Sequence, residues 1–153
     1  MNNNIMKAIA VIKGSPNYPE LQGTVSFEQK SAGVMVTANI CGLPKGNGKC
    51  GGRIFGFHIH EGMSCSGNAD DPFADTKAHY NPHGCEHPNH AGDMPPLFGC
   101  NGYAFLSFIT DRFTIDEILG RTVVIHDMPD DFKTQPSGSS GNKIGCGNVE
   151  IRN

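Results

Sequence analysis

The sequence predicts an all-β protein, an antiparallel sandwich or flattened barrel of about eight short strands. Three observations predict it: 20 glycines and 10 prolines among 153 residues, short segments that alternate apolar and polar residues, and a single short helical signature. A chain of this length fits one domain, which we expect to span residues 1–153.

The strands are predicted from apolar runs and from alternation. Residues 7–12 form an apolar run, and residues 23–29 alternate, with Val25 and Phe27 on the same face. Alternate residues of 33–40 are also apolar, and a turn around Gly33 joins these two segments into a hairpin. The further strands that we expect lie at residues 54–60, 103–109, 122–126 and 147–151.

The remaining segments predict one helical turn and two long loops. Thr114 and Glu117 have the spacing of a capping box, and Gly120 can end a helical turn over residues 114–119. Residues 61–98 and 127–145 are rich in Gly and Pro and lack a strand pattern. Loops of this length in a small domain are usually functional.

Composition excludes several classes of function. A formal net charge of -3 and a pI near 6.1 argue against nucleic-acid binding, which needs a basic surface. No apolar run reaches about eighteen residues, so no membrane span is expected. The first residues do not resemble a signal peptide, which favours a cytoplasmic location and reduced thiols, although six cysteines suggest disulfides or metal sites.

Six of the seven histidines lie between residues 58 and 90. His58 and His60 alternate at the end of a predicted strand, so both imidazoles can reach one metal ion. His126 also ends a strand, where a lone histidine is more often an ordinary core residue.

A second group of potential ligands occupies one predicted loop. His79, His87, His90 and Asp93 offer three imidazoles and a carboxylate within fifteen residues, a donor set typical of tetrahedral zinc. His83 lies beside a Pro-Gly turn and is expected to face solvent.

The motifs, in their order, resemble those of the Cu,Zn superoxide dismutase family, of the bacterial type and without a leader, from about residue 7 to residue 151. The segments that carry the resemblance are Lys7 to Gly14, Phe27 to Gln29, Gly56 to Glu61, His79 to Pro82, His90 to Asp93, Gly120 to His126, and Cys146 with Gly147. The resemblance implies a Greek-key sandwich and disproportionation of superoxide by copper redox cycling, with zinc in a structural role.

The resemblance also implies roles for individual residues. It makes His79 the ligand shared by both metals and a proton carrier, Asp130 the carboxylate behind the ligands, and Lys143 the cation that attracts superoxide where the family has arginine. It pairs Cys65 with Cys146. The copper ligands are then His58, His60, His79 and His126, and the zinc ligands are His79, His87, His90 and Asp93.

Some alternatives stay open. His83 could replace His87 at zinc, and a Cys85 thiolate could bind zinc, although the zinc site is complete without it. Cys41, Cys50 and Cys100 have no partner in the family pattern.

Two other functions are weighed against that of a superoxide dismutase. A catalytically weak copper- and zinc-binding protein of the same fold is the alternative to an enzyme. A zinc hydrolase fits poorly, because Glu61 and Gly62 follow His60. The expected partner is superoxide, and a homodimer is compatible with the sequence.

Overall fold

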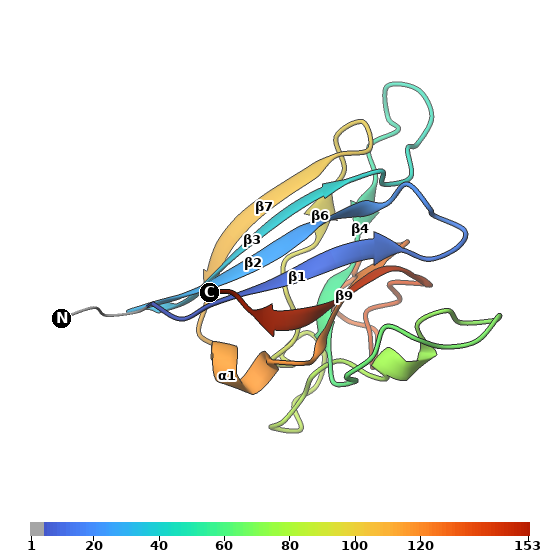
Figure 1. The fold of residues 1–153 in the computed structure, drawn as a ribbon. Helices are drawn as coiled ribbons and strands as arrows, with labels where there is room; N and C mark the ends of the chain where they lie inside the picture. Colours follow the sequence, from blue (N-terminus) through green and yellow to red (C-terminus); the bar gives the residue numbers. More distant parts are fainter. Residues whose placement is uncertain (1–4) are drawn as a thin grey trace.

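A computed structural model describes residues 5–153, which form nine strands, one short α-helix and one 3-10 turn (Figure 1). The strands are β1 (Lys7–Gly14), β2 (Gln22–Lys30), β3 (Gly33–Cys41), β4 (Ile54–Phe55), β5 (Phe57–His60), β6 (Leu97–Phe98), β7 (Ala104–Thr110), β8 (Thr122–His126) and β9 (Lys143–Ile151). The 3-10 turn η1 covers Ala74–Thr76, and the helix α1 covers Ile115–Ile118.

Seven strands form one antiparallel sheet in the order β5-β8-β9-β1-β2-β3-β7. The chain crosses between the two ends of this sheet on its way from β3 to β5 and again from β7 to β8. These crossings give the predicted Greek-key arrangement. Figure 1 shows β7, β3, β2 and β1 side by side in one curved layer, with the loop that carries η1 below β9.

A small ladder of β4 and β6 links the two edges of the large sheet. One residue, Gly56, separates β4 from β5, while a tight turn at Asn101 and Gly102 joins β6 to β7, with positive φ at both turn residues. The ladder therefore connects the β5 edge to the β7 edge and makes the sheet a flattened barrel.

The core confirms the predicted alternation. Val25 and Phe27 of β2 are buried, as are Val34, Val36 and their neighbours at every second position of β3. The predicted helical turn is also present, because the Glu117 carboxylate accepts a hydrogen bond from the Thr114 N–H and Gly120 follows with φ +80°. In the part of the chain described, the α-helix spans only four residues, too few to cross a membrane.

Three predicted boundaries are wrong. The strand expected over 54–60 divides at Gly56, which bonds to Met128 and His126 instead of extending the β4–β6 ladder. Residues 97–98 form β6 inside the expected loop 61–98. The last strand begins at Lys143 instead of residue 147, because Lys143 pairs with β8, and Gly145 and Cys146 pair with both β1 and β8.

Candidate metal centre

Strands β5 and β8 hold three of the histidines in one place. His58 and His60 lie on β5, which pairs with β8 in a register that ends beside His126. On its other side, β5 bonds to the long loop through the bridges His58↔Asp93 and His60↔His79. The loop thereby brings His79 next to the strand histidines.

Four buried imidazoles form the first ligand group, in which the ligand atoms lie within 4.8 Å of one another: His58, His60, His79 and His126. In His58, His60 and His126 the ring nitrogen that points away from the centre of the group bonds to an oxygen acceptor. His60 Nδ1 lies 2.8 Å from the Lys77 carbonyl and His126 Nδ1 lies 3.3 Å from the Gly141 carbonyl. Their inner nitrogens, both Nε2, face each other at 3.2 Å, so these rings turn a free lone pair towards a common point.

The second group shares His79 with the first and contains His79, His87, His90 and Asp93, again within 4.8 Å. The Asp93 Oδ1 lies 2.9 Å from His79 Nδ1, and Oδ2 accepts a hydrogen bond from the His90 N–H. Three nitrogens and a carboxylate at one point match the donors that zinc takes in proteins.

Asp130 joins the two groups from behind. Its Oδ2 accepts a hydrogen bond from His58 Nε2 at 2.8 Å, and its Oδ1 accepts one from His87 Nε2 at 2.7 Å. These bonds fix the tautomers of both rings, with Nδ1 of each left as the metal-facing atom. Asp130 thus links a histidine of the first group to a histidine of the second.

Three buried nitrogens in the described residues have no hydrogen-bond partner: His58 Nδ1, His79 Nε2 and His87 Nδ1. Buried polar atoms are almost always satisfied, so three such atoms in two adjacent groups need an explanation. Metal ions supply it, because each orphan nitrogen belongs to one of the two ligand groups. The residues therefore fit a copper ion in the first group and a zinc ion in the second.

Burial keeps three of the imidazoles neutral. It lowers the pKa of His58 to about 4 and that of His126 to about 3, and it lowers the pKa of His60 well below its ordinary value. Burial opposes ionisation of Asp130, but the hydrogen bonds from His58 and His87 outweigh it and lower the pKa of that carboxyl. At neutral pH His58, His60 and His126 are thus neutral and Asp130 is ionised. Neutral imidazole is the form that binds metal.

Several residues that support this site were missed from the sequence. The carbonyls of Lys77 and Gly141 orient His60 and His126, and Gln135 binds the backbone of His87. Gly138 leaves room for the link between Asp130 and His87, since a Cβ atom there would lie 2.0 Å from Asp130 Oδ1. No local pattern marks these residues, because each acts on a partner far away in sequence.

The open alternatives at zinc gain no support. His83 and Cys85 are exposed and lie outside both ligand groups. Cys41, Cys50 and Cys100 are exposed free thiols. The predicted disulfide between Cys65 and Cys146 is present, and it ties the long loop to β9.

Lys143 lies beside the first ligand group. A cavity of about 460 Å³ is lined by Lys143 together with His60, His79 and His126. Lys77 and Glu61 line the same cavity. The cavity therefore gives a small molecule access to the buried imidazoles beside Lys143.

The barrel and the two ligand groups that share His79 define a two-metal protein of the Greek-key β class. A model of the copper/zinc superoxide dismutase family matches residues 21–149. Over 146 aligned residues the chain is 31% identical to the superoxide dismutase (Cu-Zn) of Deinococcus radiodurans, with 84% of this chain and 76% of that relative covered. The chain belongs to the copper/zinc superoxide dismutase family.

Proposed function

We propose that this protein disproportionates superoxide to dioxygen and hydrogen peroxide at a centre that holds copper and zinc. In this proposal His58, His60, His79 and His126 bind copper, and His79, His87, His90 and Asp93 bind zinc. The observation that carries it is the set of three unpartnered buried nitrogens, which belong to two groups sharing His79. Membership of the family supplies the reaction.

Bound copper supplies the one-electron chemistry, in which two superoxide ions and two protons give one dioxygen and one hydrogen peroxide. His79 is the proposed proton carrier, the role that the family resemblance implies; the residue lines the cavity, and its buried Nε2 has no hydrogen-bond partner. Its Nδ1 stays fixed beside Asp93. In this proposal a proton carried by His79 passes to the peroxide product.

Lys143 is the proposed guide for the anion. A local cation beside the site attracts superoxide despite the negative net charge of the chain. Lys143→Glu should slow the second-order reaction at low ionic strength, and added salt should shrink the difference. Lys143→Arg should equal or exceed the parent rate. Copper content should stay constant in both variants, and identical salt-dependent rates in all three proteins would refute the guiding role.

Metal analysis paired with a superoxide turnover assay tests the main proposal. We expect one copper and one zinc per chain and turnover that is lost when copper is removed. Full metal loading without turnover would instead identify a catalytically weak metal-binding protein of the same fold.

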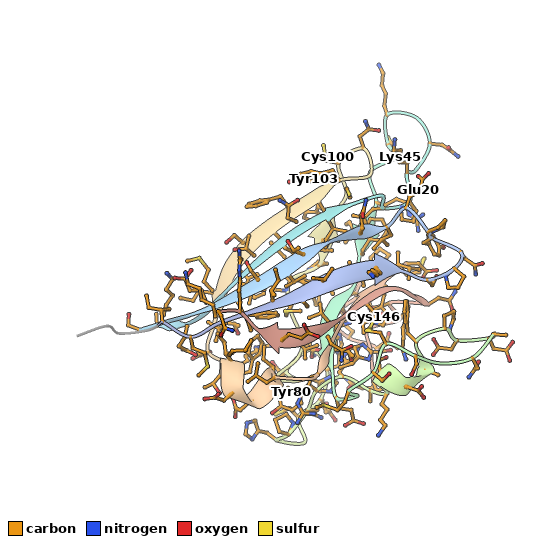
Figure 2. All side chains as sticks on the ribbon, viewed as in Figure 1. Glu20, Lys45, Tyr80, Cys100, Tyr103 and Cys146 are labelled. Atoms are coloured by element: carbon orange, nitrogen blue, oxygen red, sulfur yellow. A yellow bond between two sulfur atoms is a disulfide. The ribbon has the colours of Figure 1, made fainter. Side chains whose placement is uncertain are left out.

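Assembly and location are further proposals. Three aromatic side chains between residues 98 and 105 are exposed, Phe98 on β6, Tyr103 in the turn that follows and Phe105 on β7, which favours a homodimer. Figure 2 shows Tyr103 at the end of the molecule opposite Tyr80, which follows His79, so association there would leave the metal cavity open. Phe105→Lys should give monomers in sedimentation experiments, whereas Val11→Lys, also exposed, should not.

A cytoplasmic location and a single domain over residues 1–153 also stay predictions. The core cluster runs from Ala8 to Val149, which supports one domain, and residues 1–4 lie outside the described residues. The Cys65–Cys146 disulfide is more typical of oxidising compartments. Cell fractionation with an antibody against the protein would decide the location.

A further inference from the structure

The ammonium group of Lys143 already has an anionic partner within the chain. Its Nζ lies 3.3 Å from Asp71 Oδ2 and 3.2 Å from the Phe73 carbonyl. The lysine side chain is 16% exposed and that of the aspartate 42% exposed. The cation is therefore engaged by a fixed carboxylate and a fixed carbonyl before any substrate arrives.

Lys143 also lies between two cavities. The cavity at the metal centre contains His60, His79 and His126, whereas a neighbouring one is lined by Asp70 and Asp71. Lys143 contributes to the walls of both. Its partner Asp71 lines the second of these cavities and not the first, so the carboxylate contacts the ammonium from outside the cavity at the metal centre.

The carboxylate of Asp71 is held in position. Its Oδ1 accepts a hydrogen bond from the Phe73 N–H at 3.0 Å, which leaves Oδ2 for Lys143. Phe73 in turn is buried against Val124 and Cys146, next to the disulfide. The ion pair is therefore built on a packed segment and does not depend on a freely rotating surface side chain.

We propose that Asp71 is a positioning residue that competes with the substrate anion for Lys143 and so limits how strongly the cavity attracts small anions. Superoxide and a carboxylate carry the same single negative charge and would bind the same ammonium group. The inference rests on the guiding role proposed for Lys143. It adds that the strength of that guidance is set by a second residue, at which substitution should increase activity.

The test compares Asp71→Asn with Asp70→Asn in fully metal-loaded protein. Both variants remove one negative charge from the same cavity wall, but only Asp71 contacts Lys143. At low ionic strength, Asp71→Asn should raise the second-order rate with superoxide by about two- to fivefold, the upper part of the range for ion pairs at protein surfaces. Asp70→Asn should change it by less, and salt should reduce the gain.

Azide titration, followed through the visible absorption of copper, gives a readout that does not need turnover. Asp71→Asn should bind azide more tightly by a similar factor, and Asp71→Glu should retain the parent affinity. The gain should vanish in the double variant Asp71→Asn, Lys143→Met when it is compared with Lys143→Met alone. Melting temperature and copper content, measured for each variant, restrict the comparison to folded and loaded proteins.

Two results would overturn the proposal. One is an equal effect of Asp71→Asn and Asp70→Asn on azide affinity, and the other is a gain that persists without Lys143. The two proposals can also fail separately. If the variants bind azide with the expected differences in affinity but the metal-loaded parent does not turn over superoxide, the proposed activity is refuted and the role of Asp71 is supported.

Discussion

The side-chain amide of Gln135 makes two hydrogen bonds to the backbone of His87. The Gln135 Nε2 donates to the His87 carbonyl at 2.7 Å, and the Gln135 Oε1 accepts from the His87 N–H at 2.8 Å. The two residues are 48 positions apart and belong to the two long loops. This pair of bonds holds a proposed zinc ligand against the loop that carries Asp130.

Gln135→Ala should therefore weaken zinc binding by about tenfold, the lower end of the range for residues that orient metal ligands. The variant frees the His87 backbone while all four proposed zinc ligands stay in place. Competition with a zinc chelator measures the effect. Lys133→Ala is the control, since that exposed side chain lies in the same loop; equal zinc affinities of the two variants would contradict the role of Gln135.

Gly138→Ala should destabilise the protein and weaken both metal sites. The new methyl group would overlap Asp130 Oδ1 and would lie close to His87 Nε2. Gly84→Ala is a matched control, because φ is positive at both glycines but nothing lies within 4 Å of a Cβ atom at Gly84. We expect the control to lose only about 1 kcal/mol of stability through backbone strain and Gly138→Ala to lose more, as measured by chemical denaturation.

The metal-free protein should lose stability as pH falls from about 6.5 to about 4. The pKa of His58 is about 4 in the folded protein, against an ordinary value of 6.5, so in this window the unfolded chain binds a proton that the folded protein excludes. The loss from His58 alone is on the order of 3 kcal/mol by pH 4. His126 adds to it in the same direction. Thermal melting of the metal-free protein at a series of pH values checks this, and a constant midpoint from pH 7 to pH 5 would contradict it.

Cys65→Ser should destabilise the oxidised protein by about 4.5 kcal/mol in the chain-entropy estimate, because the two cysteines are 81 positions apart in sequence. The Cys41→Ser variant removes an exposed free thiol instead and should leave the unfolding midpoint unchanged. Urea denaturation without reductant compares the two. If Cys65→Ser matched the parent under these conditions, the disulfide would have no stabilising effect.

The sequence predicted the strands of the large sheet well, since alternation in β2 and β3 follows directly from burial of one face. The start of β9 could not be found in this way. Gly145 suggests a loop, yet a Cβ atom there would lie 2.8 Å from the Leu21 side chain and 3.3 Å from Ile12 of β1, so the strand requires a small residue at this position. That requirement depends on β1, far away in sequence.

The same distinction applies to the metal centre. The proposed ligands were found because histidine and aspartate donate to metals at spacings that a short segment displays. Gln135, Gly138 and Asp71 were not found, because their effects depend on which loop folds against which. A single sequence contains no local sign of such contacts.

The bridge between His60 on β5 and His79 on the long loop has a consequence for maturation. Three of the four proposed copper ligands lie on paired strands and are in position once the barrel has folded, whereas His79 arrives only when the loop is ordered. Zinc binding and disulfide formation both act on that loop. The protein should therefore mature in a fixed sequence of steps, with barrel folding first, loop ordering second and completion of the copper coordination sphere last.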